Sequence, residues 1–189
     1  MKKCKKSVAK FQLPTYYKQR TENEINQQIK TLIMEAIITA ATVLASYLSM
    51  TTTTDTNYAY NAAYEDGRVA RIEVYDNQTG SLNKKLQYAY TYDRDGRLTR
   101  KEARRYNPET GEWTPAYVYT YSFDATGYTV AYRQWDSMKA DYSDVSEKTV
   151  YQRLTNGLMA VDNYRLNGKT LERTDGTVVM IAGDFVANK

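Results

Sequence analysis

A tyrosine-rich unit that recurs about every thirty residues is the strongest constraint on the fold of this 189-residue chain. Its clearest copy is Tyr92-Asp93-Arg94-Asp95-Gly96-Arg97-Leu98-Thr99, and an earlier copy runs from residue 64 to residue 71. Later copies are anchored on Phe123-Asp124-Ala125-Thr126-Gly127 and on Asn156-Gly157. The glycines at 67, 96, 127 and 157 are 29, 31 and 30 residues apart. Repeats at such a period indicate stacked supersecondary units.

Each unit is predicted to be a β-hairpin. Aromatic residues alternate with small or polar ones along residues 88–92 and 117–123, which is the period of a strand. Asp-Gly and Asn-Gly pairs between these segments favour tight reversals. Since the connections are too short for parallel crossovers, we expect an all-β fold: an antiparallel meander of about four hairpin repeats. The expected strands, nine or ten in number, cover residues 57–64, 68–76, 82–92, 97–107, 113–123, 128–136, 145–154, 158–166, 169–173 and 177–182.

The alternation places many tyrosines on one face of this sheet. The chain has 19 tyrosines against 3 phenylalanines and 2 tryptophans, and a tyrosine ring can pack while its hydroxyl reaches solvent or a partner. Aromatic rows of this kind favour packing within the sheet, and the alternative is a platform for sugar rings. The candidate ligand surface consists of Tyr90, Trp113, Tyr117, Tyr119 and Trp135.

Charged residues recur at matching positions after the first two glycine turns. Arg71 and Glu73 follow Gly67 by four and six residues, and Arg100 and Glu102 follow Gly96 likewise. By alternation these four side chains share one face, where they are expected to form a solvated charge lattice with arginines lying over tyrosine rings. The alternative is that these charges form a binding surface.

The first fifty residues differ from the rest and are predicted to be a leader, followed by the β-repeat domain at 51–189. Residues 1–50 hold eight lysines or arginines and three glutamates, a net charge of +5, whereas residues 51–189 have a net charge of −1. The basic balance therefore lies in the leader, and the domain offers no electrostatic case for nucleic acid.

Residues 36–45 are apolar and resemble the core of a signal peptide, with cleavage positions at Ala45, Ser46 and Ser49. The segment ahead of this core is longer than a normal signal peptide's, so a start codon assigned too far upstream, with translation beginning near Lys30 or Met34, is one explanation. The alternative is an uncleaved anchor helix, although the apolar run is short for a membrane span. Contact with a membrane is expected only through this leader.

The residue types argue against an enzyme. The chain has no histidine, and its one cysteine, Cys4, lies in the predicted leader, which excludes imidazole bases and thiol nucleophiles from the domain. Three carboxylate pairs remain for a hydrolase, each in a predicted turn: Asp93 with Asp95, Glu65 with Asp66, and Glu109 with Glu112. Asp93-Arg94-Asp95-Gly96 also resembles part of a calcium loop but lacks the other ligands. We expect structural turns, with no catalytic residue, metal or cofactor.

Residues 92–99 resemble the tyrosine-aspartate (YD) repeat of bacterial Rhs-type secreted proteins, in which Tyr-Asp precedes Gly-Arg-Leu by three residues. Residues 123–127 keep half of the motif. The repeat period in this chain is longer than in the Rhs-type proteins. The leader and the Tyr-rich hairpins together, over residues 57–182, are similar to a small secreted family of unknown function found in gut Bacteroidetes. The resemblance implies export and an all-β repeat, without a known activity.

The sequence therefore predicts an exported, non-enzymatic β-repeat protein that works by display or binding in the periplasm or at the cell surface. The alternative is a glycan-binding module that uses tyrosine and tryptophan, and a remote one is a carboxylate-dependent hydrolase. Partners would be a glycan or an envelope protein, and pairing of free edge strands offers a route to oligomers.

Overall fold

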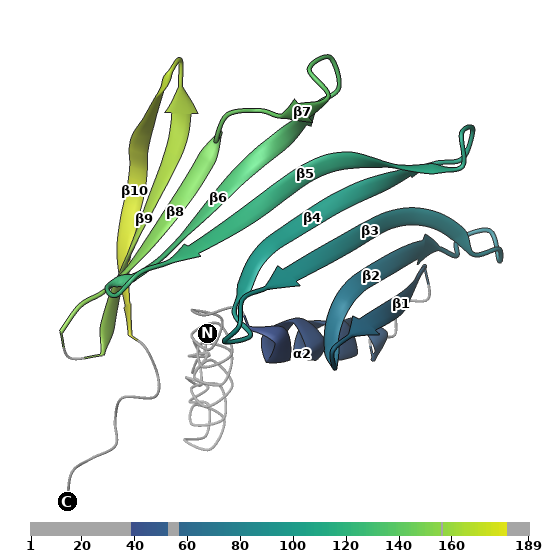
Figure 1. The fold of residues 1–189 in the computed structure, drawn as a ribbon, viewed down its shortest axis with the longest axis horizontal. Helices are drawn as coiled ribbons and strands as arrows, with labels where there is room; N and C mark the ends of the chain where they lie inside the picture. Colours follow the sequence, from purple (N-terminus) through teal and green to yellow (C-terminus); the bar gives the residue numbers. More distant parts are fainter. Residues whose placement is uncertain (1–38, 53–56, 156, 181–189) are drawn as a thin grey trace, which may run out of the picture.

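The computed structural model describes residues 39–52, 57–155 and 157–180, and these form one antiparallel β-sheet with a short helix against it (Figure 1). The helix α2 spans Ala40–Thr51. The strands are β1 Tyr58–Glu65, β2 Arg68–Asp76, β3 Asn83–Tyr92, β4 Leu98–Asn107, β5 Glu112–Phe123, β6 Gly127–Asp136, β7 Asp141–Tyr142, β8 Glu147–Arg153, β9 Leu158–Asn167 and β10 Thr170–Met180. The all-β antiparallel meander and the expected number of strands are confirmed.

Strands adjacent in the chain are adjacent in the sheet, whose order is β1-β2-β3-β4-β5-β6-β8-β9-β10, with β7 paired to the end of β6. This order follows from the turns, which are too short to let a strand cross over its neighbour. Gly67, Gly96 and Gly157 have φ of 72°, 76° and 70°, as tight reversals need. Gly127 is not among the glycines with positive φ. It is needed because the backbone of Tyr151 on the neighbouring strand leaves no room for a Cβ atom.

Two details near the C-terminal half differ from the expectation. The two short strands expected at 169–173 and 177–182 are one strand, β10, because the register shift between Arg173 and Asp175 is a bulge and not a turn. Asp175-Gly176 therefore lies within a strand. Strand β7, which is two residues long and pairs Tyr142 with Trp135, was not expected from the sequence.

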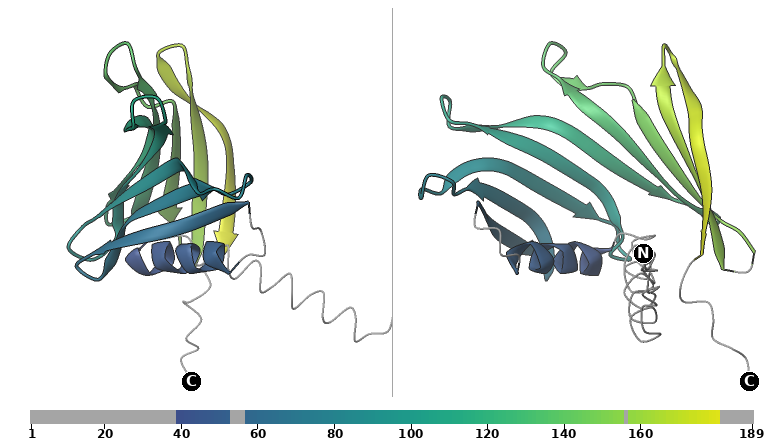
Figure 2. Two further views of the ribbon diagram at one scale, coloured as in Figure 1. Left: turned by 90° about the vertical axis from the view of Figure 1, so that its right-hand side faces the viewer. Right: turned by 180° about the vertical axis from the view of Figure 1, so that it is seen from behind.

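Cross-strand pairing divides the side chains between two faces. One face carries Tyr60, Ile72, Tyr90 and Tyr121 and packs against α2, and we call it the α2 face. The other, here called the opposite face, carries Arg71, Glu73, Gln87, Glu102 and Val118. The sheet twists strongly from β1 to β10, and α2 lies against its N-terminal strands (Figure 2).

The main core lies between α2 and the first four strands. Val43 of α2 packs with Val69, Ile72 and Leu98, and all four side chains are buried. Thr39 caps the N-terminus of the helix. Its hydroxyl accepts from the backbone N–H of Thr42, and the Thr42 hydroxyl accepts from the N–H of Thr39. This reciprocal cap satisfies two N–H groups that would otherwise lack partners.

The structure thus places part of the predicted leader within the folded body, because residues 40–50 form most of α2. Residues 1–38 lie outside the described residues, and the leader boundary near residue 50 stays a prediction. Within the ranges that the structure describes, no helix is both long enough and apolar enough to cross a bilayer.

Candidate functional site

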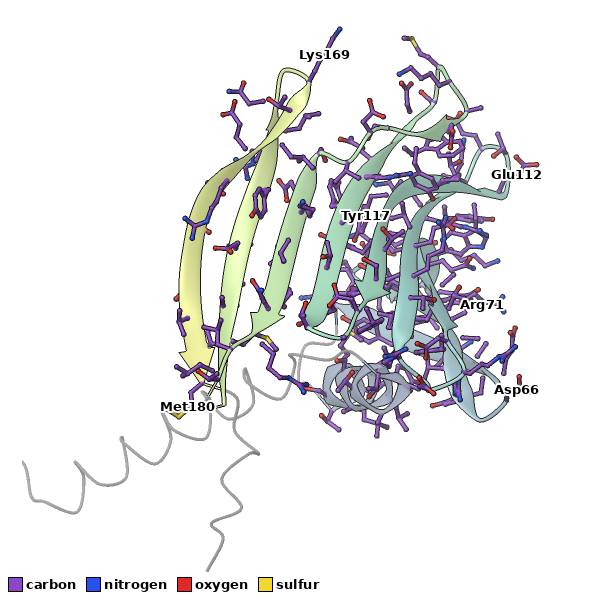
Figure 3. The ribbon with its side chains drawn as sticks, turned by 60° about the vertical axis from the view of Figure 1, so that its left-hand side comes forward. Asp66, Arg71, Glu112, Tyr117, Lys169 and Met180 are labelled. Atoms are coloured by element: carbon purple, nitrogen blue, oxygen red, sulfur yellow. The ribbon has the colours of Figure 1, made fainter. Side chains whose placement is uncertain are left out.

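The five residues of the predicted ligand surface do not form one surface. All five are half-buried, but Tyr90, Tyr117 and Tyr119 lie on the α2 face, whereas Trp113 and Trp135 lie on the opposite face. Figure 3 shows Tyr117 in the middle strands of the sheet.

Strand geometry explains why the two tryptophans lie on the other face of the sheet from the three tyrosines. A register shift between Ala103 and Arg104 changes the alternation in β5, so Trp113 pairs with Tyr106 and their rings meet edge to face at 5.1 Å. Trp135 is an odd-numbered residue of β6, whose even-numbered residues face α2, and its ring lies 5.1 Å from that of Tyr142. The two tryptophans therefore share no aromatic platform with Tyr90, Tyr117 and Tyr119.

The tyrosines of β5 and β6 form a compact cluster. The ring centroids of Tyr117 and Tyr119 are 5.7 Å apart, and Tyr132 lies 5.6 Å from Tyr117 and 5.1 Å from Tyr119. The interplanar angles lie between 45° and 82°, so the rings pack against each other's edges and do not form a flat stack.

Lys101 of β4 lies beside this cluster on the α2 face. It pairs with Tyr90 on β3 and with Tyr119 on β5, and its ammonium group lies 4.8 Å from the ring centroid of Tyr88. Such a contact is an attractive cation–π interaction. We call the following set the tyrosine–lysine surface: Tyr88, Tyr90, Lys101, Tyr117, Tyr119 and Tyr132. Lys101 was not predicted from the sequence, because a register shift lies between Thr91 and Tyr92. A count outward from the Gly96 turn would have placed Arg100, and not Lys101, opposite Tyr90.

Burial shifts the acid–base equilibria of this surface. It raises the pKa of Tyr88 to about 12 and raises the pKa of Tyr90 and of Tyr119. Burial lowers the pKa of Lys101 because the charged ammonium loses hydration. Among the described residues, no carboxylate forms an ion pair with this ammonium. The surface therefore combines neutral phenols with a partly desolvated cation that an acceptor group of a ligand would stabilise.

The same face becomes polar on the C-terminal strands. Thr149 donates its hydroxyl proton to Asn163 Oδ1 at 2.8 Å, and Asn163 Nδ2 donates to Asp175 Oδ1 at 2.6 Å. The register continues from Tyr121 through Val130 to these three residues on β8, β9 and β10. Aromatic rings thus give way to hydroxyl, amide and carboxylate groups along one row of the sheet.

The opposite face carries the expected lattice of charges, but its central carboxylate, that of Glu102, is buried and not solvated as expected. Glu102, which is 9% exposed, accepts from Arg100 Nη2 and from Arg104 Nε, both at 2.7 Å. Burial opposes ionisation of Glu102, but the two arginines outweigh it and lower the pKa. Glu73 accepts from Tyr75 and from Gln87. Because these carboxylates are ionised and hydrogen-bonded, they stabilise the sheet and offer no general acid.

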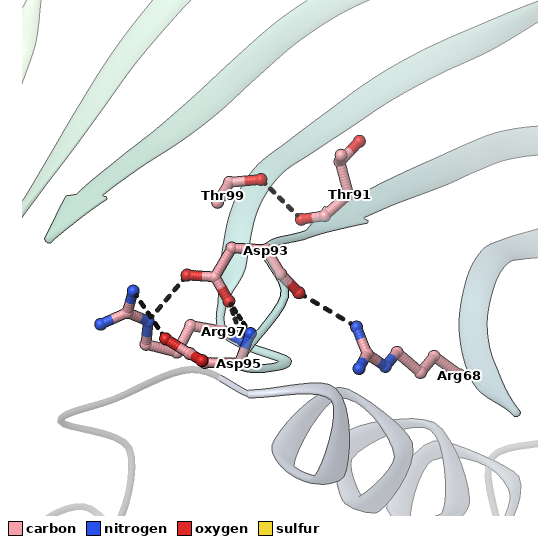
Figure 4. Close-up of polar contacts among 6 residues, drawn as sticks. All are labelled: Arg68, Thr91, Asp93, Asp95, Arg97 and Thr99. Carbon is pink, nitrogen blue, oxygen red and sulfur yellow. Dashed lines mark hydrogen bonds and ion pairs between the residues drawn. The ribbon is translucent and has the colours of Figure 1, made fainter. Parts of the chain in front are cut away.

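Asp93 and Asp95 of the candidate carboxylate pairs are used by their turn (Figure 4). Asp93 Oδ1 accepts from the N–H groups of Asp95 and Arg97, and Asp93 Oδ2 accepts from Arg97 Nε at 2.7 Å. Asp95 pairs with the same guanidinium at 3.3 Å. This is the hydrogen bonding of an Asx-type turn. Over the described ranges, no cluster of three or more acidic, cysteine or histidine side chains could hold a metal ion.

A small hollow of about 150 Å³ lies near the turn that joins β5 to β6, between Arg97, Asp124, Tyr128 and Arg153. The Asp124 carboxylate accepts from the N–H groups of Thr126 at 2.7 Å and Gly127 at 2.9 Å. It is therefore already used by the turn, as Asp93 is in the preceding one.

Comparison with known proteins yields one family and several solved structures. A model described as a family of unknown function (DUF3836) matches residues 25–153, a range that includes α2. A protein of unknown function from Bacteroides fragilis NCTC 9343 is 24% identical with a TM-score of 0.57, over 65% of this chain and 91% of that one. This likeness shows that the two proteins share a fold.

Two DUF3836 proteins are also similar. The one from Bacteroides vulgatus ATCC 8482 is 26% identical with a TM-score of 0.43, over 46% of this chain and 88% of that one. The one from Parabacteroides distasonis ATCC 8503 is 28% identical with a TM-score of 0.45, over 50% and 89%. No curated protein matches. The expected likeness to a family of unknown function from Bacteroidetes is confirmed, whereas the YD-repeat likeness stays a prediction.

Proposed function

Because this chain belongs to DUF3836, a family of unknown function, we infer its role from its own surfaces and propose that it is an exported, non-enzymatic binding protein of the periplasm or cell surface. The observation that supports binding is the tyrosine–lysine surface. There, half-buried phenols surround Lys101, whose ammonium has no carboxylate partner among the described residues. Half-buried aromatic residues that keep a polar end are common anchors in binding interfaces.

The non-enzymatic part of the proposal is supported by what the charged side chains already do. Asp93 and Asp124 hold turns, and Glu102 is held by two arginines. The chain has no histidine. A hydrolase would need a carboxylate with a raised pKa, and the pKa values of these three are lowered.

The test replaces Tyr119 with a photo-crosslinking phenylalanine analogue in cells that make the full chain. We expect cross-links from position 119 to an envelope component and none from the matched position Trp135 on the opposite face. Equal cross-linking from both positions, or none from position 119, would contradict the assignment of the ligand surface.

Export is tested on the same material. N-terminal sequencing of protein recovered from the envelope should begin near the cleavage positions Ala45, Ser46 or Ser49. Cleavage there would cut α2 and remove Val43 from the core, so the exported protein would have the face beneath α2 uncovered. An intact Met1 on exported protein would contradict cleavage and favour an anchor helix.

A glycan is the second candidate ligand, supported by the polar row that adjoins the tyrosines on the α2 face. Thr149, Asn163 and Asp175 offer the donors and acceptors that sugar hydroxyls need, and Tyr119 and Tyr132 offer rings for sugar faces. On glycan arrays, Tyr132→Ala should lose about tenfold or more in affinity, as expected for an aromatic anchor. Trp135→Ala should bind as the parent does. An array without any bound glycan would leave an envelope protein as the ligand.

A further inference from the structure

The sheet face beneath α2 is apolar and buried. Val69, Ile72 and Leu98 are 1%, 0% and 1% exposed, and Tyr92 and Tyr121 pack around them. These side chains are hidden by one short helix. If α2 moved away, a contiguous apolar patch would be open to solvent, and patches of this kind commonly mark interaction sites.

The helix that covers this face is uncharged and has a single apolar stripe. Val43, Leu44, Tyr47 and Met50 contact the core cluster, at positions i, i+1, i+4 and i+7. This spacing places them on one side of a helix. No charged residue occurs from Ala40 to Thr51, so no ion pair holds this helix to the sheet.

The backbone of α2 is joined to the sheet at one end. Thr39 forms an isolated bridge with Arg97, and the Ala40 N–H donates to the Gly96 carbonyl at 2.9 Å. Along the rest of the helix, Val43 is the one residue that is fully buried, and Leu48 is 51% exposed. A twelve-residue helix is marginal by itself, so the groove supplies most of what keeps these residues helical.

We propose that this face is a helix-binding groove that α2 occupies as a resident ligand. Its partner is a helical segment of another protein, uncharged on its docking side, with apolar residues at i, i+1, i+4 and i+7. The partner replaces α2 after the helix swings away or is removed. Docking of an apolar helical stripe into a groove is a recurrent recognition mode. The inference goes beyond the tyrosine–lysine surface and does not depend on it.

The test uses the full chain and a fluorescein-labelled synthetic peptide of residues 39–52 as the helical probe. Val43→Asp places a charge in the core side of α2 and should free the groove. Leu48→Asp, on the exposed side, is the matched control. Since a seated α2 reduces the fraction of chains that can bind, the Val43→Asp chain should bind the peptide about tenfold or more tightly than the parent and the control.

A second variant weakens the attachment without a buried charge. Ala40→Pro removes the N–H that donates to Gly96 but keeps the helix, because proline is favoured at the first helical position. It should also raise the peptide affinity, with an unchanged far-UV circular dichroism spectrum.

A peptide of the same composition with its apolar residues redistributed should not bind. The proposal is overturned if both variants keep the β spectrum but bind the peptide no better than the parent, or if the redistributed peptide binds equally. It is also overturned if both variants lose the β spectrum, because α2 would then be an irreplaceable part of the core.

Discussion

Gly127 gives the sharpest test of how the sheet is packed. It is the first residue of β6 and pairs with Gln152 of β8. A Cβ atom added at this position would overlap the carbonyl oxygen of Tyr151 and lie 2.9 Å from its carbonyl carbon. Because the obstacle is the backbone of the neighbouring strand, no side-chain rotation can relieve the overlap, and the two strands must separate.

The cost of Gly127→Ala follows from that separation. Overpacking of a close contact costs about 1 to 3 kcal/mol. Opening the end of the β6–β8 ladder also threatens the nearby bond from the Arg153 N–H to the Thr126 carbonyl, at 2.8 Å, and a backbone hydrogen bond contributes about 1 kcal/mol. We expect the variant to lose about 3 kcal/mol of the free energy of unfolding.

Gly96→Ala is the matched control, since this glycine is also at a hairpin turn but for a different reason. Its φ is 76°, and the added Cβ would meet only the Arg68 guanidinium at 3.7 Å, an ordinary contact. The cost is then the left-handed backbone alone, about 1 kcal/mol. Urea unfolding followed by tryptophan fluorescence measures both variants. If Gly127→Ala is no more destabilising than Gly96→Ala, the close approach of β6 to β8 is wrong.

Three further predictions concern the core and the two faces. Val43→Ala should cost about 2 kcal/mol because Val43 is buried among core residues, whereas Leu48→Ala, on the exposed side of α2, should change stability by less than about 0.5 kcal/mol in urea unfolding; equal effects would contradict the seating of the helix. The hydrogen bond from Tyr75 lowers the pKa of Glu73 below 4.5, and this effect is larger than the opposing effect of burial. The ionised Glu73 therefore stabilises the fold above pH 4.5, and this contribution is lost as the pH falls through the pKa of Glu73 in the folded state. Glu73→Gln should flatten the acid side of the pH–stability profile, and a profile identical to the parent's would argue against the bond. Burial raises the pKa of Tyr88 from 10.0 to about 12, so its contribution is complete below pH 10 and is lost as the pH rises through 12; absorbance titration at 295 nm should show one late-ionising phenol fewer in Tyr88→Phe.

The strands could be predicted because their signals are local. Alternation along residues 88–92 and 117–123, with glycine turns between them, specifies strand, turn and pairing order together. The positive φ of Gly96 followed from the same reasoning. These features depend on contacts between neighbouring segments, which a single sequence displays.

Bulges could not be predicted, and they account for the misplacement of Trp113, whereas Trp135 lies on the opposite face by ordinary alternation along β6. The extra residue opposite the Ala103/Arg104 step moves Trp113 to the opposite face, and the bulge after Arg173 made one strand look like two. A bulge changes which face every later residue occupies, and nothing in period-two alternation marks it beforehand.

The packing of the apolar segment at residues 40–51 against the sheet could not be predicted from the sequence either. An apolar run of this length is equally typical of a signal core and of a helix that packs on a sheet. The choice depends on Ile72 and Leu98, which lie far along the chain and meet α2 only after the hairpins have formed.

The neighbour-to-neighbour order of the sheet has a consequence for how the chain folds. Each long strand closes its ladder with the next one along the chain, so most contacts are local and the contact order is low for an all-β protein. Such a topology should fold faster than a sandwich or barrel of equal size. Amide exchange should be graded, as it is in repeat arrays. It should begin at β10, which is exposed along most of its length, and reach the strands beneath α2 last.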